Sequence, residues 1–438
     1  MYSFRRLNEV VELLVDQRTG IITKCYELQP EPDAPQLFHF YAQASNTKTF
    51  SGNPNFRNTG GVSTERKVAM AKAIGEAVER YCSAFFDLEE MPLSSYDEAK
   101  FNAVHPDWFQ YFTDEQYNLP GFPFLPFDTS TKIRWTEAIN LCTGESQHIP
   151  AACVWMPYYF DRSSGDTPIF QPISTGLSCH CSLEEALLGG ILEVVERDAF
   201  SMTWQGMLSH PQIIIESLSD ENYELLRKIE SVGHKVFLLN ATTELGVPVI
   251  LAVSHRERQP APPLVVAAAS ELDPEIAVRK CLEELVHTRR YMRELQAWGG
   301  VYEEPSDFNN IKDQIDHLRF WGSEAVLEHS NFLISSQERV NFSDIKSMEK
   351  DSVIKSLQHL TLVLRNNGYS SYFVDLTTDD VKNLGLRVVR AVVPGLHPFF
   401  IGHAWRARNC KRLYTAPQKY GHPPISEGND NAYPHPFP

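Results

Sequence analysis

The segment GEAVER at residues 75–80 recurs in nearly the same form as ILEVVER at residues 191–197. On a helix, residues three and four positions apart lie on the same face. Each copy therefore groups two glutamates and an arginine: Glu76, Glu79 and Arg80 in the first copy, and Glu193, Glu196 and Arg197 in the second. Apolar residues surround the second copy almost completely, which is typical of a buried helix. Because isolated buried carboxylates are destabilising by several kcal/mol each, we expect a cation to lie against these glutamates.

Two interpretations of the repeat are open at this point. In the first, each glutamate pairs with its own arginine or with a neighbouring helix in a structural network of ion pairs. In the second, the two copies share a purpose: four acids converge on hard cations, which prefer oxygen ligands, and two arginines face phosphate. The occurrence of two such copies on hydrophobic helices favours the second interpretation.

The composition is that of a globular protein. With 438 residues, of which 42% are apolar, the chain can form one large domain or about two to three ordinary ones. Its formal net charge is -16, and Lys and Arg are spread along the sequence. This balance argues against binding to a nucleic-acid backbone and provides no basic patch for a membrane surface. A basic peptide is a more natural partner.

The sequence also indicates the compartment. Residues 4–16, FRRLNEVVELLVD, predict an amphipathic helix in which Glu9 and Glu12 interrupt any signal-peptide core. No stretch approaches the roughly 18 consecutive apolar residues that read as a membrane-spanning helix. The eight cysteines are scattered and expected to be reduced. We therefore expect a cytoplasmic protein.

The run Cys179-His180-Cys181 offers a metal site as an alternative use of cysteine. Zinc fingers and ribbons generally combine CxxC or wider pairs with matching distant ligands. A zinc site is therefore not predicted in this run.

The first half of the chain predicts strands, a loop and a long helix. Residues 20–26 and 37–44 alternate like strands, and residues 51–61 read as a polar loop rich in Gly and Asn. A long helix follows, with Ser63 as its expected N-cap. Residues 88–170 are rich in proline and aromatics, which predicts irregular chain around short strands. Packing is the expected role of these aromatics, with a peptide groove as the alternative.

The second half predicts two more long helices separated by buried strands. Residues 174–178 form a turn, after which Ser182 and Glu185 have capping-box spacing, and such a helix start can bind phosphate. Residues 236–240, 247–253 and 264–269 read as buried strands. Asp273-Pro274 then begins a helix that carries Glu284, His287 and Arg289, three residues that a solvated face would also explain. Strands and helices mix without regular alternation, which favours an α+β fold.

The last stretch, from about Ala416, is polar and proline-rich and ends YPHPFP at residues 433–438. A tail of this composition is commonly disordered. Prolines at alternate positions nevertheless prefer an extended conformation with little entropy left to lose, which suits a tail docked into a groove. The composition alone leaves both alternatives open.

Four phrases together resemble the YcaO family: KAIGEAVERYC (72–82), STGLSCHCSLEEALLGGILEVVERDAF (174–200), ELDPEIAVRKCLEEL (271–285) and VVRAVVPGLHP (388–398). The resemblance extends from about Ile21 to Pro438, and the combination is specific. It implies mixed sheets and helices around a central ATP and Mg²⁺ site. The implied domains are residues 1–57, with the N-terminal helix and strands, residues 58–415, the catalytic core, and residues 416–438, the proline-rich tail.

The resemblance implies an ATP-dependent cyclodehydratase. In this chemistry a Cys, Ser or Thr side chain of a ribosomally made peptide attacks the preceding amide carbonyl. ATP phosphorylates the resulting oxygen, and loss of phosphate leaves a thiazoline or oxazoline. The charged residues suit this demand, because phosphoryl transfer depends on positioning, Mg²⁺ and cationic neutralisation more than on a protein nucleophile.

The resemblance also assigns residues by position. The acids expected to organise Mg²⁺ and phosphate are Glu76, Glu79, Glu193 and Glu196. Arg80 and Arg197 are candidates for contacting phosphate or orienting those carboxylates. Further nucleotide-site residues are Ser178, Glu185, Glu284 and Arg289. The terminal Pro434, Pro436 and Pro438, with the free carboxylate, resemble the ending of azoline-forming members and would help to order the active site.

The sequence departs from the family pattern in several places. Many relatives have Gly-Lys-Gly where this chain has Gly61-Val62-Ser63, and Lys72 replaces a common Ser. Cys181 stands for a common Asn, and His287 for a common Gln. We therefore expect the nucleotide contacts at those positions to differ from the family pattern.

The family further implies partners. Ring-forming members commonly work with an E1-like or related protein that recognises the leader of the precursor peptide, and a flavin dehydrogenase can act later on the ring. We expect both as separate proteins, and a homodimer by analogy. Two alternatives remain: peptide thioamidation at the same ATP site, against which the proline ending argues, and an ATP-binding scaffold or assembly factor that modifies no peptide.

Overall fold

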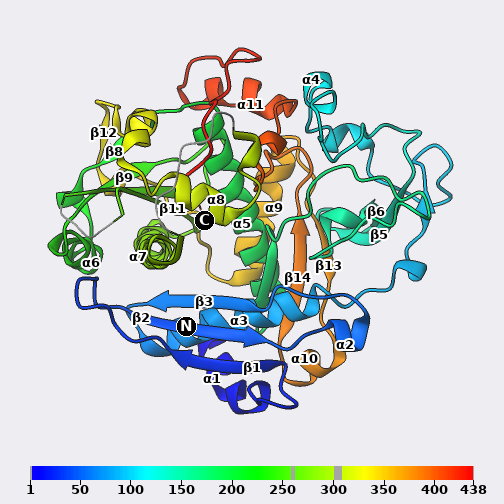
Figure 1. Cartoon of the computed structure of the whole chain (residues 1–438), viewed down its shortest axis with the longest axis horizontal. Helices are drawn as coiled ribbons and strands as arrows, with labels where there is room; N and C mark the ends of the chain where they lie inside the picture. The colour runs from blue at the N-terminus through cyan, green and yellow to red at the C-terminus, as the bar shows by residue number, and fades with distance from the viewer. Residues whose placement is uncertain (1, 258–261, 300–307, 438) are drawn as a thin grey trace. The chain divides into compact units, whose positions relative to one another are not determined.

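The structure, a computed structural model, describes residues 2–257, 262–299 and 308–437. Figure 1 shows the chain coloured from its N-terminus to its C-terminus, with helices and strands labelled. Its contacts divide the chain into two units, each made of separate stretches of the sequence. Unit 1 comprises Met1–Leu28, Phe38–Val194 and Lys350–Leu396, and unit 2 comprises Gln29–Leu37, Val195–Glu349 and His397–Pro438. Helices and strands are mixed in both units, and the predicted α+β class is confirmed.

Unit 1 contains two sheets. The first has the order β1-β2-β3, and both pairings are antiparallel. Its strands are β1 (Ile22–Glu27), β2 (Phe38–Ala44) and β3 (Asn58–Ser63). The second has the order β4-β5-β13-β14-β7, with β6 paired to β5. Its strands are β4 (Leu93–Ser94), β5 (Ile133–Asn140), β6 (Ser146–Pro150), β7 (Leu177–His180), β13 (Tyr372–Asp375) and β14 (Arg387–Val392).

Helix α3 (Arg66–Cys82) lies at the centre of unit 1, where it packs on β2 and β3 and also on β7. Small residues permit this close approach. A Cβ atom added to Gly61 of β3 would lie 2.2 Å from the carbonyl oxygen of Ala69. The amphipathic N-terminal segment forms the predicted helix, α1 (Tyr2–Leu14), which packs on α3.

Two sequence-based boundaries around α3 are wrong. Part of the expected loop at 51–61 is strand β3, which Gly60 and Gly61 concealed because glycines carry no hydrophobic alternation. Ser63 ends that strand instead of capping the helix, and its hydroxyl accepts a hydrogen bond from the backbone N–H of Glu65 at 3.2 Å. The helix begins at Arg66, after Glu65 in an extended conformation.

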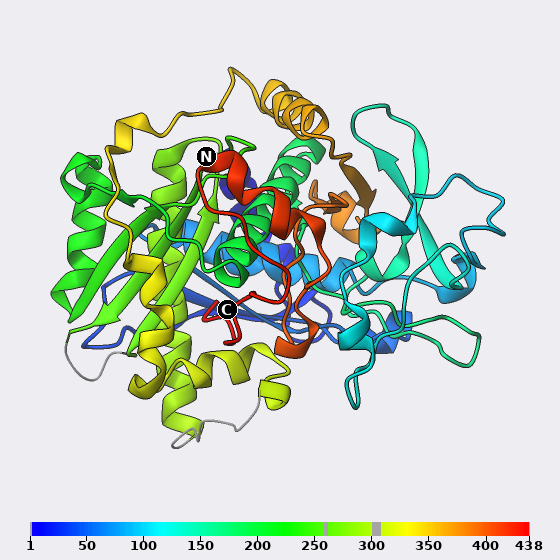
Figure 2. The same cartoon turned by 90° about the horizontal axis from the view of Figure 1, so that it is seen from above.

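The remaining helices of unit 1 are short except for α9. They are α2 (Lys48–Ser51), α4 (Asp114–Tyr117), α9 (Val353–Asn366) and α10 (Asp379–Asn383). Figure 2 shows that the chain between β4 and β7 is mostly irregular around a few short elements, as the proline and aromatic content predicts. Many of its rings contact one another, for example Phe112 with Phe124 at 5.4 Å between ring centres.

Unit 2 is built on a five-stranded sheet with the order β11-β10-β9-β8-β12. Its strands are β8 (Gln212–Ile213), β9 (His234–Asn240), β10 (Val249–Arg256), β11 (Leu264–Ser270) and β12 (Arg339–Val340). Its helices are α6 (Asp220–Ser231), α7 (Pro274–Gly299), α8 (Gln314–Phe320) and α11 (Lys411–Thr415). Helix α7 packs on β10 and β11, and α6 packs on α7 and β9.

The predicted starts of the second and third long helices are confirmed. Helix α5 (Leu183–Gln205) begins after Ser182, whose hydroxyl accepts from the backbone N–H of Glu185 at 3.2 Å. Helix α7 begins at Pro274, and the side chain of Asp273 accepts from the backbone N–H of Glu275 at 3.0 Å. The residues of α5 up to Val194 belong to unit 1 and the rest to unit 2. Among the described residues, no helix is both long enough and apolar enough to cross a membrane.

Candidate nucleotide and magnesium site

Helix α3 carries the first copy of the repeated charge group. The Nη2 atom of Arg80 donates to Oε1 of Glu76 at 3.1 Å, one turn away on the same helix. The other carboxylate oxygen of Glu76 lies 3.4 Å from the backbone N of Gly60, which donates to it. Glu76 and Arg80 thus form an ion pair within the helix, and β3 contributes a backbone contact to the same carboxylate.

Glu79 points from α3 toward β7. Its Oε1 atom accepts a hydrogen bond from the backbone N–H of Cys179 at 2.7 Å. Burial raises the pKa of Glu79 well above its ordinary value, the charges of Glu76 and Glu193 raise it further, and Arg80 and the Cys179 hydrogen bond oppose the rise. Repulsion from two neighbouring carboxylates therefore disfavours the ionised form of Glu79.

Glu193 reaches the same cluster from α5. Its Oε2 atom accepts from the backbone N–H of Gly176 at 2.9 Å. Gly176 has φ of 89°, and an added Cβ would lie 2.2 Å from the carbonyl oxygen of Ala391. Glycine is thus required at position 176 both for its backbone conformation and for close approach. We call Glu76, Glu79 and Glu193 the acidic cluster of unit 1.

Two glycines set the distance between α5 and the strands beside it. A Cβ on Gly189 would lie 2.8 Å from the hydroxyl oxygen of Ser178, and one on Gly190 would lie 2.8 Å from the carbonyl oxygen of Gly176. Gly190 would also meet the Cβ of Ala391 at 3.0 Å. The Gly189-Gly190 pair therefore lets α5 approach β7 and β14 closely enough for Glu193 to reach Gly176.

Two further predicted nucleotide-site residues belong to the same part of unit 1. Ser178 is buried in β7, opposite Val389 of β14. Glu185 lies in the first turn of α5, where its Oε2 accepts from the Ser182 hydroxyl at 3.0 Å. The described contact of Glu185 stabilises the start of the helix, and a role with nucleotide stays a prediction for both residues.

The second copy of the charge group continues along α5 into unit 2. The Oε2 atom of Glu196 accepts from the backbone N–H of Ser270, at the end of β11, at 3.2 Å. Its other oxygen lies 3.6 Å from Nε of Arg197. The guanidinium of Arg197 lies over the rings of Phe437, at 4.4 Å, and Phe399, at 5.3 Å. This arginine is thus placed between a carboxylate and the C-terminal tail.

Lys280 of α7 joins the acids of unit 2, and the sequence-based list omitted it. Its Nζ atom donates to Oε1 of Glu271. Burial alone would lower the pKa of Lys280, but Glu271, and then Glu196 and Glu284, raise it above its ordinary value. The sequence does contain a signal for this contact, because Lys280 precedes Glu284 by four positions on the same helix.

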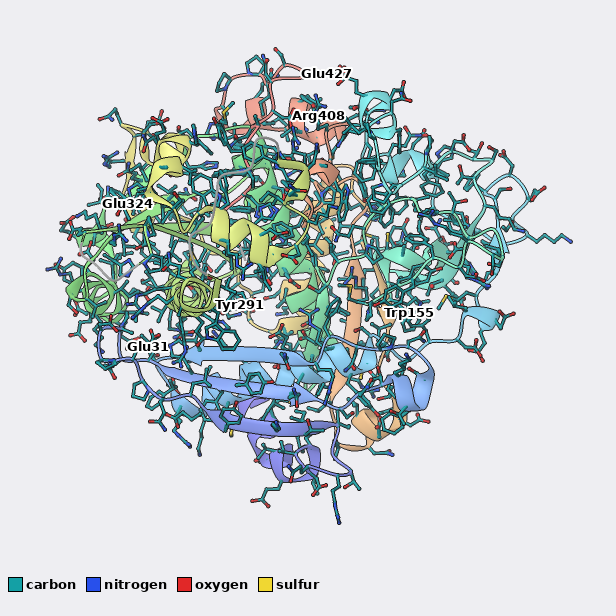
Figure 3. All side chains as sticks on the ribbon, viewed as in Figure 1. Glu31, Trp155, Tyr291, Glu324, Arg408 and Glu427 are labelled. Atoms are coloured by element: carbon teal, nitrogen blue, oxygen red, sulfur yellow. The ribbon has the colours of Figure 1, made fainter. Side chains whose placement is uncertain are left out.

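The described contacts of Glu284 and Arg289 differ in kind. Oε2 of Glu284 lies 3.6 Å from Nδ1 of His287, and about two fifths of its side chain is exposed. Arg289 is buried, and its guanidinium donates to Oε2 of Glu31 at 3.1 Å, to the carbonyl oxygen of Asp33 at 2.7 Å and to Nε2 of His234 at 2.9 Å. Glu31 is labelled in Figure 3. Arg289 thus connects α7 with residues 29–37, which belong to the same unit. Its role toward nucleotide stays a prediction.

The C-terminal tail is docked within unit 2. The carbonyl oxygen of Tyr433 accepts from the indole of Trp204 at 2.9 Å, and that of Pro434 accepts from the indole of Trp321 at 2.8 Å. The carbonyl oxygen of His435 lies 2.9 Å from Nδ1 of His317. Pro434, Pro436 and Phe437 are buried, and Pro438 lies outside the described residues. Of the two alternatives for the tail, the docked one is correct for residues 433–437.

The acidic cluster fits a divalent cation that is carried by a nucleotide. Among the described residues, no three His, Cys, Asp or Glu side chains are arranged to hold a metal by themselves. Mg²⁺ in nucleotide sites usually takes one or two carboxylates together with phosphate oxygens and water. A cation beside Glu79 would offset the repulsion that raises the pKa of this carboxyl group.

The sequence matches a known protein family and two uncharacterised proteins. A family model described as YcaO cyclodehydratase, ATP- and Mg²⁺-binding, matches residues 60–397. An uncharacterised protein of Methanothermobacter thermautotrophicus is 28% identical over 348 residues, which cover 78% of this chain and 82% of the relative. A protein of Rhizobium leguminosarum bv. trifolii, described as uncharacterised and in the tfuA 3' region, is 31% identical over 131 residues, which cover 28% of this chain and 30% of the relative.

Solved structures share the fold. A heterocyclase in complex with substrate and cofactor has a TM-score of 0.79 at 23% identity; the match covers 99% of this chain and 57% of that one. The chain therefore spans little more than half of that heterocyclase. YcaO from Methanopyrus kandleri bound with AMPPCP and Mg²⁺ has a TM-score of 0.67 at 22% identity, with 92% and 93% of the two chains covered.

A chain of the E. coli microcin synthetase McbBCD complex has a TM-score of 0.63 at 15% identity, with 97% of this chain and 98% of that chain covered. The family match covers both helices that carry the repeated charge group. ATP and Mg²⁺, predicted here as cofactors, are those of the family description. On this match, the chain belongs to the YcaO family.

Proposed function

We propose that this chain is an ATP-dependent cyclodehydratase that converts cysteines of a ribosomally made precursor peptide into thiazolines, with serine and threonine as further candidate substrates. The observation that carries the proposal is the meeting of Glu79 of α3 and Glu193 of α5 at residues 176–179, where they accept hydrogen bonds from the backbone N–H groups of Cys179 and Gly176. It lies within residues 60–397, the part of the chain that matches the family model.

In the proposed site, the carboxylates of the acidic cluster bind Mg²⁺ and orient the nucleotide that it accompanies. Glu196 follows Glu193 by three positions on α5 and lies on the same helix face, so we assign it to the same function. Arg80 and Arg197 orient these carboxylates or contact phosphate. Ser178, Glu185, Glu284 and Arg289 are proposed as further nucleotide-site residues.

The chemistry needs a leaving group on the amide carbon. The cysteine thiol loses its proton as its sulfur forms a bond to the preceding carbonyl carbon, and the electrons of the C=O π bond move to the oxygen. That oxygen receives the γ-phosphoryl group of ATP, and ADP is released. Phosphate then leaves with that oxygen as the amide nitrogen loses its proton, which gives the C=N bond of the ring. The residues of the chain hold the reacting groups together and neutralise the charge that develops on the phosphoryl oxygens.

Partners are part of the proposal. We propose that a separate E1-like or related protein presents the precursor peptide, that a flavin dehydrogenase can act afterwards, and that the chain forms a homodimer. The fold shared with a chain of a multi-protein microcin synthetase supports a separate partner.

Mass spectrometry of a cysteine-rich peptide tests the proposal. The peptide is incubated with the protein, ATP and Mg²⁺, with and without a candidate leader-binding partner. Each ring lowers the peptide mass by about 18 Da through loss of water, whereas thioamidation raises it by about 16 Da and a scaffold changes neither. A gain of about 16 Da would replace the proposal with thioamidation, and an unchanged mass with every candidate partner would contradict both.

The raised pKa of Glu79 gives a prediction about pH. An ordinary glutamate has a pKa of about 4.3, and the folded chain holds that of Glu79 well above this value. Without Mg²⁺ the carboxyl group of Glu79 therefore binds a proton more tightly in the folded state than in the unfolded state. The free energy of unfolding then falls as pH rises from the unfolded pKa to the folded pKa of this group. Because Mg²⁺ needs the carboxylate, we expect the rise in melting temperature caused by Mg²⁺ with AMPPCP to grow with pH.

Thermal unfolding in buffers from about pH 5 to about pH 8 measures this effect. Glu79→Gln serves as the reference, because it removes the titrating group and keeps an oxygen that can accept from Cys179. Mg²⁺ with AMPPCP should raise the melting temperature of the wild-type protein more than that of this variant, and the difference between the two rises should increase with pH. The same pH profile in both proteins would show that Mg²⁺ does not compete with a proton on Glu79.

A further inference from the structure

Arg390 is a buried arginine in the middle of β14, and the site described above makes no use of it. Only 4% of the residue is exposed. In the sheet it is paired with Val374 of β13 and Leu177 of β7. Its Nη2 atom donates to the carbonyl oxygen of Ile173 at 2.7 Å, which fixes the loop before β7.

The rest of the guanidinium has no acceptor among the residues that the structure describes. Among the described residues, neither Nε nor Nη1 of Arg390 has a hydrogen-bond partner. A buried donor that lacks a partner is destabilising, and more so when the group is charged. Two such nitrogens on one buried cation therefore indicate that an acceptor from outside the chain completes the site.

The charges around Arg390 identify the kind of acceptor. Burial lowers the pKa of its guanidinium to about 10; Cys153 and Glu193 oppose this fall, and Arg80 adds to it. At neutral pH Arg390 therefore remains a cation, with a second cation close enough to repel it. An anion that contacts both would relieve this repulsion, and phosphate is, with carboxylate, an anion whose geometry matches the donors of a guanidinium group.

The backbone connects the strand that carries Arg390 with the loop that Glu193 contacts. Its neighbour Ala391 donates from its backbone N–H to the carbonyl oxygen of Gly176 at 2.8 Å. The N–H of the same Gly176 donates to Glu193 at 2.9 Å. The loop that Arg390 holds through Ile173 is therefore the loop that Glu193 holds through Gly176.

We infer that Arg390 binds the phosphoryl group that ATP transfers to the substrate oxygen and that leaves as inorganic phosphate. This inference rests on the proposed function. In the transfer, the bond between the γ-phosphorus and the β,γ-bridging oxygen breaks as a bond to the former carbonyl oxygen forms. The phosphate then leaves with that oxygen, and its electrons are those of the broken C–O bond. Arg390 neutralises charge on the non-bridging oxygens in both steps.

The test compares Arg390→Gln and Arg390→Lys with Arg134→Lys. Arg134 is a matched control because it is buried in β5 of the same sheet, with Nη1 donating to the carbonyl oxygens of Leu88 and Met91. Only Nε of its guanidinium lacks a partner among the described residues. Thermal unfolding is measured with and without inorganic phosphate, and ATP turnover is measured as kcat and KM.

In the wild-type protein we expect phosphate to raise the melting temperature, and in Arg390→Gln we expect this rise to be lost. The kcat for ATP should fall by about 100-fold in Arg390→Gln while the KM for ATP changes by less than about 3-fold, because the lost contact acts on the transferred group. Arg390→Lys should recover part of both effects. Arg134→Lys should lower the melting temperature without phosphate and leave kcat and the phosphate effect unchanged.

Retention of the phosphate effect and of kcat in Arg390→Gln would overturn the inference. So would losses that only parallel the loss of stability seen in Arg134→Lys. If the wild-type protein binds phosphate through Arg390 but forms no ring, the proposed function fails and the phosphate site stands. If the wild-type protein forms rings and Arg390→Gln does so at the same rate, only the present inference fails.

Discussion

Replacement of Glu193 or Glu196 by Gln is expected to reduce ATP turnover by at least about 100-fold without unfolding the protein. A neutral amide binds Mg²⁺ poorly, because hard divalent cations prefer charged carboxylate oxygens. The amide oxygen of Gln can still accept from the backbone N–H of Gly176 or Ser270, the partners of the two glutamates. The local structure should therefore survive while the metal affinity does not.

Glu184→Gln is the matched control for these variants, since it removes a carboxylate from the first turn of the same helix. Its turnover should equal that of the wild-type protein. Phosphate release and thermal unfolding are measured on all four proteins. Unchanged turnover in both Glu193→Gln and Glu196→Gln would refute the assignment of these acids to Mg²⁺ and nucleotide.

Removal of residues 434–438 is expected to slow ring formation by at least about 100-fold and to lower the melting temperature by only a few degrees. The tail reaches the second charge group, because the ring of Phe437 lies 4.4 Å from the guanidinium of Arg197. Loss of the tail would remove the contact between Phe437 and Arg197, and small displacements of a group that positions phosphate have large effects on rate. Rates of ring formation by mass spectrometry and thermal unfolding test this together.

A single substitution separates the ring from the rest of the tail. Phe437→Leu keeps an apolar side chain but removes the nearer of the two cation–π contacts of Arg197, and we expect roughly a 10-fold loss of rate from a contact of this kind. Phe109→Leu is the matched control, because Phe109 is as buried as Phe437, at 2% against 3% exposed, and packs on other rings in unit 1. The Phe109→Leu variant should lose stability but keep its rate of ring formation.

A truncated enzyme that forms rings at the full rate would show that the tail has no part in the reaction.

The sequence predicted the elements whose signals are local. Asp273-Pro274 and Ser182 mark helix starts because a capping side chain acts on the next few residues, and the structure has both caps. The repeated charge groups predicted a meeting of acids from two helices, and in unit 1 Glu193 lies close enough to Glu79 to raise its pKa. The resemblance to the family, carried by long phrases, predicted the fold class.

Features that depend on long-range contacts escaped prediction. Strand β3 contains Gly60 and Gly61, which carry no strand pattern, and Gly61 lies against α3. Arg289 could not be connected with Glu31, because 258 positions separate them in the sequence. Arg390 lies in an apolar strand, where only the arrangement of its neighbours shows that two of its nitrogens have no acceptor among the described residues.

The glycine pair of α5 has a consequence for engineering. The spacing between this helix and the loop before β7 is set by an atom of the main chain, since a methyl group at position 190 would lie 2.8 Å from the carbonyl oxygen of Gly176. Alanine at position 190 would therefore act as a wedge that displaces Glu193 by a fraction of an ångström while all charged side chains remain present. The activity of such a variant would show whether catalysis needs only the presence of the carboxylates or also their exact positions.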